Sequence, residues 1–313
     1  MYSNLGKVGV IYGGLSSERD ISLKSGEAIL GALLKEGLDA EAVDLKTEDP
    51  KSVEQIIQDT HIDIAFIAMH GKFGEDGKLQ AILENMGVNF VGSDSLASSF
   101  AMDKIISKKL FEENNIPTPR YTTLNRLNNL MLDQVTFPVI VKPQSQGSSI
   151  GITFVNDASE IEKALKCAFR YDDSIILEEY VKGRELTVSI LDNKALEPIE
   201  ILPKNKLFDF QAKYSKGLTD YILPANINSN LRSKVQRLSL NAHKALGCRH
   251  FSRIDLILDE HNNPFILELN TIPGFTSTSL LPKAASYEGI DFQQLCIKLL
   301  TLAARDAVTT LNK

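Results

Sequence analysis

The 313-residue sequence predicts two architectures in one chain, a parallel α/β sheet near its N-terminus and an α+β region after it. The first is indicated by apolar runs and helical runs that alternate over roughly residues 5–95. The second is indicated by pairs of short apolar runs around turns in the rest of the chain. The length allows two or three packed units, because a single hydrophobic core usually stops growing near about 250–300 residues.

The N-terminal region begins with a strand, a glycine turn and a helix. Residues 7–14 (KVGVIYGG) are an apolar run that ends in two glycines, and residues 16–37 follow with helical periodicity. Two further buried strands, a helix and a last short strand are predicted at residues 39–45, 62–71, 76–87 and 89–93. Such alternation places ligand-binding groups at the carboxyl ends of the parallel strands.

The pattern changes after residue 95. Residues 95–117 predict one helix, and residues 137–155 predict two strands separated by a loop rich in glycine and serine. An amphipathic helix follows, and then two strands around a Lys-Gly turn. Residues 204–225 carry few signals of buried strands and many polar groups, which is typical of mobile lids over active sites. A helix over residues 229–247 leads to the last strand pair.

Acids and an amide recur within this last strand pair. Because strand side chains alternate between two faces, Arg253 and Asp255 share one face of the first strand. By the same rule, Glu268 and Asn270 share one face of the second strand. Four polar side chains are therefore expected on one patch of the sheet.

A turn about His261 and Asn262 predicts the register of this hairpin. It places Asp255 opposite Glu268, and residue 253 opposite residue 270. Two facing carboxylates repel and are costly to desolvate unless a cation lies between them. Oxygen ligands of this kind suit Mg²⁺ that is held partly by protein and partly by phosphate. An edge hairpin whose polar face meets solvent accounts for the same residues equally well.

Composition and charge argue against several classes of protein. The net charge of −6 and the pI near 5.5 do not fit a nucleic-acid-binding surface, which needs a basic footprint. Cys167, Cys248 and Cys296 lie far apart without CxxC spacing, so we expect buried thiols in a reducing cytosol rather than disulfides or a zinc site. The N-terminus lacks a signal-peptide pattern, and no apolar run approaches the ~18 residues of a membrane span. We therefore expect a cytoplasmic protein with no nucleic-acid or membrane partner.

Two stretches are candidates for nucleotide binding. In VKPQSQGSSIG, Lys142 ends a strand and a turn of glycines and serines follows at residues 147–151, which forms a cradle for an anion without Walker spacing. In ILEEYVKGRE, apolar side chains and carboxylates suit an adenine slot with an acid on the ribose. Each stretch has a plain alternative, a flexible hairpin turn and a strand pair with surface acids. Lys104 in AMDKIISKK is likewise consistent with a solvated helix lysine.

The order of these features is more specific than any one of them. An α/β domain is followed by a lysine, a second lysine beside a glycine-serine loop, LEEYVKGRE, and finally the polar hairpin. This order resembles that of the ATP-grasp enzymes. Within that group, segments in every part of the chain resemble the D-alanine–D-alanine ligases: YGGLSSERDISLKSG, AMHGKFGEDGKLQ, AMDK, VIVKPQSQGSSIG, AKY, RIDL and ELNTIPGFTSTSLLP.

The resemblance implies a fold and a reaction. An N-terminal Rossmann-like parallel sheet domain (residues 1–100) would precede an ATP-grasp fold of two α+β subdomains, at residues 101–183 and 184–313, with a lid loop at 204–225. The implied reaction is ATP-dependent ligation of two D-alanines to D-alanyl-D-alanine through an acyl phosphate, with release of ADP and phosphate, for peptidoglycan precursor synthesis. ATP and two Mg²⁺ or Mn²⁺ ions are the implied cofactors, and a homodimer is the implied assembly.

The resemblance also implies roles in binding ATP and metal. The metal ligands would be Asp255, Glu268 and Asn270. The phosphates would contact Lys104, Lys142, Ser148 and, from the lid, Lys213. Adenine and ribose would lie against Glu178, Glu179, Tyr180, Val181 and Glu185.

Further roles concern the two amino acids. Glu18 would take the ammonium of the first D-alanine and His70 would lie beside its carboxylate, although a histidine that closes a buried strand is also explained by packing. Arg253 and the backbone N–H of Gly274 would stabilise the tetrahedral oxyanion. The second D-alanine would lie against Ser279 and Leu280. Ser148 and Tyr214 would join Glu18 in a hydrogen-bonded triad when the lid closes.

The sequence departs from the common family pattern at a few positions, and two other functions are alternatives to this interpretation. Asp20 stands where the family often has glutamate, and residues 144–146 (QSQ) stand where charged residues are common, so the detailed loop contacts are open. Another ATP-grasp ligase would keep Lys142, Glu268 and Asn270 but would not need Glu18 or the GFTSTS segment. A catalytically silent nucleotide-binding regulator would be expected to lack metal ligands or the arginine, and this chain has them.

Overall fold

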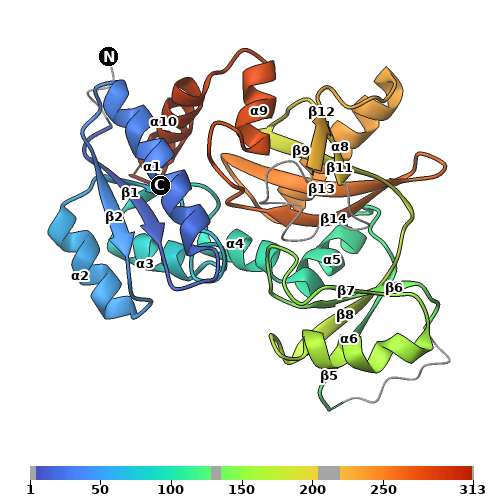
Figure 1. Ribbon diagram of the computed structural model, residues 1–313. Coiled ribbons are helices and arrows are strands. Elements are labelled where there is room, and N and C mark those ends of the chain that lie inside the picture. Colours follow the sequence, from blue (N-terminus) through green and yellow to red (C-terminus); the bar gives the residue numbers. More distant parts are fainter. Residues whose placement is uncertain (1–4, 128–134, 204–218, 312–313) are drawn as a thin grey trace.

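The computed structural model describes residues 5–127, 135–203 and 219–311. These residues form a four-stranded sheet, a second four-stranded sheet and a six-stranded sheet, with helices packed against each of them (Figure 1). The first sheet is parallel throughout, and the other two are antiparallel. The predicted combination of an α/β region with a following α+β region is confirmed.

The first sheet has the strand order β2-β1-β3-β4. Its strands are β1 (Val8–Gly13), β2 (Ala40–Leu45), β3 (Ile64–Ile67) and β4 (Asn89–Val91). The helices against it are α1 (Arg19–Lys35), α2 (Pro50–Thr60), α3 (Lys78–Met86) and α10 (Phe292–Leu311). Because β1 alternates its side chains, Val8 and Val10 pack with α1 and α10, whereas Ile11 packs with α2 and α3. The end of the chain therefore packs against its beginning.

The helix predicted over residues 95–117 is two helices, α4 (Ser95–Met102) and α5 (Lys104–Glu113). Asp103 separates them, because its backbone is extended and its carboxylate accepts hydrogen bonds from the N–H groups of Ile105 and Ile106. An aspartate in this position caps the following helix. The prediction of one helix was wrong because it overlooked this internal cap, which sets Lys104 at the first turn of α5.

The second sheet has the order β5-β8-β6-β7. Its elements are β5 (Tyr121–Asn125), β6 (Val139–Pro143), β7 (Thr153–Val155), the 3₁₀ turn η2 (Ala158–Glu160), α6 (Ile161–Ala168) and β8 (Ser174–Glu179). Val141 and Leu177 pack under α6. Lys142 and Glu178 have the opposite strand parity, so they lie on the other face, which Figure 1 shows turned toward the third sheet.

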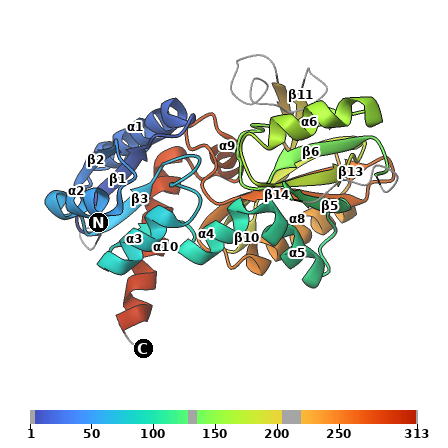
Figure 2. The same cartoon turned by 90° about the horizontal axis from the view of Figure 1, so that it is seen from below.

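The third sheet has the order β12-β11-β9-β13-β14, with β10 paired to β9. Its strands are β9 (Gly183–Leu191), β10 (Lys194–Ala195), β11 (Ile199–Pro203), β12 (Thr219–Ile222), β13 (Phe251–Asp259) and β14 (Pro264–Asn270). The helix α8 (Ser229–Ala245) covers one face, and α9 (Leu280–Tyr287) follows β14 (Figure 2). The two strands predicted around the Lys182–Gly183 turn exist, but β8 and β9 belong to different sheets, so this turn links the sheets.

A β-bulge interrupts the pairing of β13 with β14. Leu256 pairs with Ile266, and the next pair is Asp255 with Glu268, so Leu267 is an extra residue in β14. The bulge shifts the alternation of side chains by one residue. As a result, Ile266 and Leu269, three positions apart, both pack into the core under α8. Without the bulge, positions 266 and 268 would share the core face.

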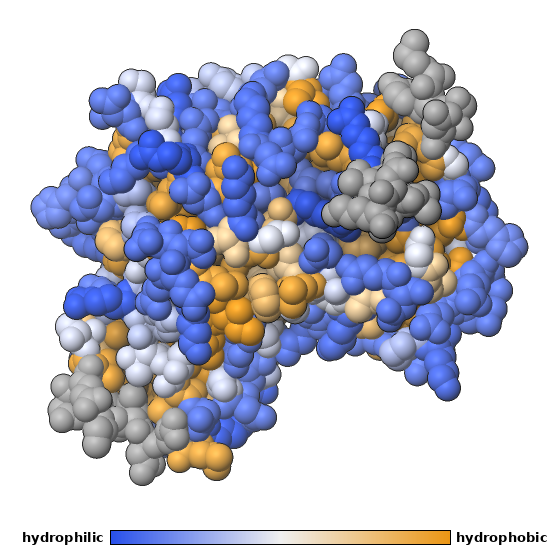
Figure 3. All heavy atoms as spheres, turned by 180° about the vertical axis from the view of Figure 1, so that it is seen from behind, coloured by the Kyte–Doolittle hydropathy of each residue, from blue (hydrophilic) through white to orange (hydrophobic). Residues whose placement is uncertain are grey.

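The remaining predictions about the whole chain have mixed outcomes. Cys248 and Cys296 are buried as expected, whereas Cys167 is half-buried because it lies on the flank of α6. No helix within the described ranges is long and apolar enough to cross a membrane. From behind, polar side chains cover most of the surface, and apolar ones gather across its middle (Figure 3).

His243 is a buried histidine in α8 with one partner. Its Nδ1 lies 2.7 Å from the Ser252 hydroxyl on β13, and its Nε2 is buried without a hydrogen-bond partner among the described residues. Burial lowers the pKa of His243 to about 4, helped by Lys244 and His250. The neutral imidazole is therefore the form that the fold accommodates.

This burial predicts a pH-dependent stability. The unfolded chain protonates this histidine near its ordinary pKa of 6.5, whereas the folded protein does so only near 4, so its contribution is present above pH 6.5 and is lost as pH falls toward 4. At pH 5 the loss should be about 2 kcal/mol. Urea unfolding of wild type and His243→Leu at pH 8 and pH 5 measures it, and the variant should lose less stability by about that amount. An equal loss in both proteins would contradict the assignment.

Candidate active site

The carboxylate of Asp255 is the most heavily coordinated group in the predicted patch. Arg253 donates to both of its oxygens, from Nε at 2.9 Å and from Nη2 at 2.7 Å. Thr187 on β9 donates at 2.7 Å, and the Asn270 amide donates at 3.2 Å. The predicted pairings of Asp255 with Glu268 and of Arg253 with Asn270 are confirmed. On the turn side of the bulge, the predicted register is one residue off.

Glu268 lies opposite Asp255 and faces a lysine from another part of the chain. Lys104 Nζ is 3.9 Å from Glu268 Oε2, and it donates to the backbone carbonyl of Gln146 at 2.6 Å. Lys104 therefore joins the glycine-serine loop after β6 to the acids of the third sheet. Because it binds a backbone carbonyl, this contact does not depend on the uncommon side chain at position 146.

The same loop reaches the first sheet through Glu18. The Ser148 hydroxyl donates to Glu18 Oε1, and both serines of the loop have positive φ angles, 50° at Ser148 and 59° at Ser149. Gly71 lies beside Glu18 with a φ of 80°, a backbone conformation that favours glycine, and a Cβ there would lie 2.8 Å from Glu18 Oε2. The structure thus brings together two of the three members of the predicted triad.

His70 is buried at the end of β3 and is held on both ring nitrogens. Its Nδ1 is 3.0 Å from the carbonyl of Ile272, and its Nε2 is 2.9 Å from the hydroxyl of Ser25 on α1. A carbonyl only accepts, so Nδ1 carries a proton, and in the neutral ring Nε2 accepts from the Ser25 hydroxyl. Glu75 lies 3.5 Å from Nδ1. His70 therefore ties the first sheet to the segment that follows β14.

The predicted nucleotide wall contains a buried charge cluster. Lys142 Nζ on β6 donates to Glu178 Oε1 on β8 at 2.6 Å, and Lys108 Nζ on α5 lies 2.5 Å from Glu178 Oε2. Burial by itself raises the pKa of Glu178, but the two ammonium groups outweigh it and hold that pKa below its ordinary value. Glu178 is therefore a carboxylate, although it is only 3% exposed.

The other residues predicted for adenine and ribose follow along the link from β8 to β9. Glu179 points to Arg120, whose Nε donates at 2.8 Å, so its carboxylate lies on the opposite face from Glu178. Tyr180 and Val181 are half-buried, and the Tyr180 ring packs edge-on against Phe154. Glu185 lies on the face of β9 that also carries Thr187. These residues follow one another from the end of β8 into β9, and the Glu179 side chain points away from the face that carries Glu178.

The segment after β14 carries the remaining predicted residues. The Ser279 hydroxyl accepts from the backbone N–H of Thr276 at 3.0 Å, and Ser279 immediately precedes α9. Leu280 is half-buried and packs against the apolar core that α1 and α10 share. A Cβ at Gly274 would lie 3.4 Å from Ser279 Oγ, which is an ordinary van der Waals contact. Lys213 and Tyr214, and residues 204–218 of the predicted lid, lie outside the described residues.

Three residues of this site were not predicted from the sequence. Thr187 holds Asp255, Ser25 holds His70, and Lys108 holds Glu178. Lys108 carried a usable signal, because it follows Lys104 by one helical turn and therefore shares its side of α5. Thr187 and Ser25 carried none, since their roles depend on contacts between elements that are far apart in the sequence.

The donor set of the patch fits a hard cation. Within the part of the chain that the structure describes, no group of three or more His, Cys, Asp or Glu side chains could hold a metal by itself. Asp255, Glu268 and Asn270 provide two carboxylates and one amide, which suits Mg²⁺ or Mn²⁺ that takes its other ligands from phosphate and water. The same set does not suit zinc in a closed structural site.

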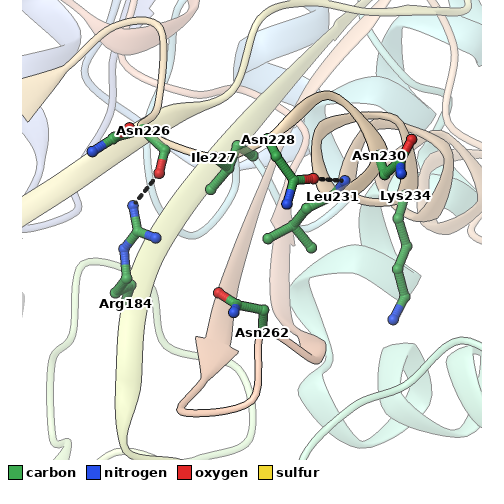
Figure 4. A pocket seen from close by; sticks show the side chains of 8 residues that line it. All are labelled: Arg184, Asn226, Ile227, Asn228, Asn230, Leu231, Lys234 and Asn262. Atoms are coloured by element: carbon green, nitrogen blue, oxygen red, sulfur yellow. Dashed lines mark hydrogen bonds between the residues drawn. The ribbon is translucent and has the colours of Figure 1, made fainter.

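A cavity of about 420 Å³ lies elsewhere, near the start of α8 (Figure 4). It is lined by Arg184, Asn226, Ile227, Asn228, Asn230, Leu231, Lys234 and Asn262. Arg184 donates to the carbonyl of Asn226 at 3.0 Å, and the Asn228 side chain caps α8. None of the predicted site residues lines this cavity. We place the site instead at the junction of the three sheets, where the contacts of Lys104, Ser148 and Arg253 lie.

Comparison with known proteins identifies the family of this chain. A family model described as D-ala D-ala ligase C-terminus matches residues 110–301, and one described as D-ala D-ala ligase N-terminus matches residues 44–93. A D-alanine–D-alanine ligase from Geotalea uraniireducens is 45% identical over 300 residues, which is 95% of this chain and 96% of the relative.

Two solved structures share the fold. The D-alanine–D-alanine ligase from Bacillus anthracis in complex with ATP has a TM-score of 0.85 at 33% identity, over 97% of this chain and 99% of that one. The VanG D-Ala:D-Ser ligase from Enterococcus faecalis has a TM-score of 0.83 at 30% identity, over 95% and 99%. The predicted ATP-grasp fold class is thereby confirmed. Since the first family model alone matches more than half of the sequence, the chain belongs to the D-alanine–D-alanine ligase family.

Proposed function

We propose that this protein joins two D-alanine molecules into D-alanyl-D-alanine at the expense of ATP, releasing ADP and phosphate. One observation carries the proposal. Residues from the three sheets and their helices converge on one site, where hydrogen bonds and ion pairs connect acids, lysines and an arginine. A peptide bond between free amino acids requires an activated carboxylate, and phosphoryl transfer from ATP to the first D-alanine provides it as an acyl phosphate. Supply of a peptidoglycan precursor is the role that the family membership supports.

The proposed metal ligands are Asp255, Glu268 and Asn270, which would hold two Mg²⁺ or Mn²⁺ ions. Bound there, the metal would neutralise phosphate charge during phosphoryl transfer. Lys104 and Lys142 approach the same region from the second sheet and its preceding helix, and we assign them to the phosphates together with Lys213 and Ser148. Support comes from the contact of Lys104 with both the loop carbonyl and Glu268.

The proposed adenine and ribose residues are Glu178, Glu179, Tyr180, Val181 and Glu185; Arg184 is not one of them, because its side chain lines the cavity near the start of α8. Because the Glu179 carboxylate is held by Arg120 on the other face, we propose that Glu179 contributes its backbone instead.

We assign the substrate residues as the family resemblance implies. Glu18 would bind the ammonium of the first D-alanine, His70 would lie beside its carboxylate, and the second D-alanine would lie against Ser279 and Leu280. Arg253 and the N–H of Gly274 would donate to the oxyanion, and the bidentate pair with Asp255 keeps the guanidinium in one orientation. Tyr214 would complete the triad with Glu18 and Ser148 and would exclude water from the acyl phosphate.

The proposal includes a cytoplasmic location and a homodimer. Both rest on the family resemblance, and the apolar area in Figure 3 is the kind of surface that a subunit contact buries. Sedimentation of the purified protein measures the assembly.

The direct test of the reaction is mass spectrometry of products from enzyme, ATP, Mg²⁺ and D-alanine. We expect D-alanyl-D-alanine and phosphate in equal amounts. D-Serine and D-lactate are offered in parallel with D-alanine, since one structural relative is a D-Ala:D-Ser ligase. A preference for D-serine as the second substrate, or phosphate release without dipeptide, would contradict the proposal.

Glu268→Gln tests the metal assignment. The change removes a charge without changing volume, so the variant should keep its fold and lose at least about 100-fold in turnover, because the metal loses a charged ligand. Circular dichroism checks the fold, and phosphate release measures turnover. Near-normal turnover by a folded variant would contradict the role of Glu268.

Arg253→Lys tests the oriented guanidinium. A lysine keeps the charge but cannot bind both oxygens of Asp255, so we expect kcat to fall by about 100-fold or more. Arg184→Lys is a matched control, because Arg184 makes the same bidentate contact with Glu200, at 2.7 and 2.6 Å, outside the site. Equal effects of the two changes would show that the geometry at Asp255 has no special role.

A further inference from the structure

Lys108 is a buried lysine that the proposed reaction does not use. Its side chain has 0% exposure, and a buried ammonium is costly unless other groups compensate it. Its Nζ lies 2.5 Å from Glu178 Oε2, donates to the Thr118 hydroxyl at 2.5 Å and to the carbonyl of Pro119 at 3.4 Å, and lies 5.1 Å from the centre of the Tyr121 ring. These contacts hold it in one place.

The cluster around Lys108 has unequal charges. Lys108 and Lys142 share the single carboxylate of Glu178, one on each oxygen. At Glu178, two ammonium groups meet one carboxylate, which leaves one positive charge in excess there. The next acid, Glu112, attracts Lys108 from farther away, beyond the Tyr121 ring. A polyanion that arrives beside Lys142 would compensate the excess charge, and Lys142 could then turn toward it while Lys108 stays with Glu178.

Lys108 is also connected to the strand that carries Glu268. Thr118, which accepts from Lys108, donates to the carbonyl of Ile266 at 2.8 Å. The N–H of Ile266 donates in turn to the carbonyl of Pro117 at 2.8 Å. Ile266 immediately precedes the bulge in β14, so Lys108 lies where the nucleotide wall meets the metal strand.

We propose that Lys108 is a positioning residue for ATP, which keeps the Glu178 carboxylate paired and in place when the Lys142 ammonium turns to the phosphates. The inference rests on the proposed function, because it takes Lys142 as a phosphate ligand. Without Lys108, Lys142 could leave only by abandoning a buried carboxylate, and this loss arises only when phosphate binds. The effect should therefore appear in the binding of ATP and not in that of D-alanine.

Lys108→Met tests the proposal, because methionine has a similar length and no charge. We expect the Kd of ATP, from calorimetry, and the KM for ATP to rise by about tenfold or more. Adenosine has no phosphate to draw Lys142 away, so its inhibition constant should change by less than about threefold, as should the KM for D-alanine. Lys109→Met is the matched control, since Lys109 is the next residue and is exposed.

A second pair of variants isolates the partner. In a Glu178→Gln background no carboxylate remains to be paired, so adding Lys108→Met should change the Kd of ATP by less than about twofold. Lys108→Arg keeps the charge, so its Kd for ATP should lie closer to the wild-type value than that of Lys108→Met. If Lys108→Met does not fold by itself, the double variant and Lys108→Arg carry the test.

Unchanged ATP affinity in folded Lys108→Met would overturn the inference, and so would an equal loss for ATP and adenosine, which indicates a merely structural role. If wild type binds ATP but makes no dipeptide, the proposed function fails while the inference about Lys108 stands or falls on the binding data alone.

Discussion

The site depends on two carboxylates, Asp255 and Glu268, that the β13–β14 hairpin holds directly opposite one another. Their pairing is possible only because the bulge at Leu267 turns Glu268 out of the core that Ile266 and Leu269 occupy. Facing acids are unfavourable alone, and the protein offsets them with Arg253 on one acid and Lys104 near the other. A cation between them, with phosphate as its further ligand, would complete this balance.

The three sheets contribute to that balance in different ways. The third sheet provides the acids, the second provides Lys142 on β6, and the helix α5 between them provides Lys104. The first sheet and its helices provide Glu18 at the start of α1 and His70 after β3. Contacts between the sheets run through the site: Ser148 binds Glu18, Lys104 lies near Glu268, and the His70 ring binds the carbonyl that follows β14. A change at one sheet therefore alters groups that belong to the others, which is the arrangement expected where ATP and two amino acids must meet in one geometry.

The sequence was enough to predict the fold class and the pairing of the two acids. The features that it did not predict depend on contacts between distant elements or on local irregularities. Period-two alternation and a turn at HNNP were enough to pair Asp255 with Glu268, because both lie on one local hairpin. The bulge was not foreseen. The predicted register nevertheless held at the acids because two errors cancel: the pairs next to the turn are one residue off, and the extra residue Leu267 restores the register at Asp255 and Glu268. Thr187 and Lys108 needed knowledge of which distant elements pack together, and the Asp103 cap was hidden inside a continuous helical pattern.

The most direct test of the central claim is the anomalous diffraction of Mn²⁺ in crystals grown with a non-hydrolysable ATP analogue. If the two hairpin acids hold the metal, we expect at least one anomalous peak between the hairpin strands. It should lie within about 2.0–2.3 Å of oxygens of both Asp255 and Glu268, or of one of them and a phosphate. Peaks that contact phosphate alone, with Asp255 still held only by Arg253, Thr187 and Asn270, would contradict it.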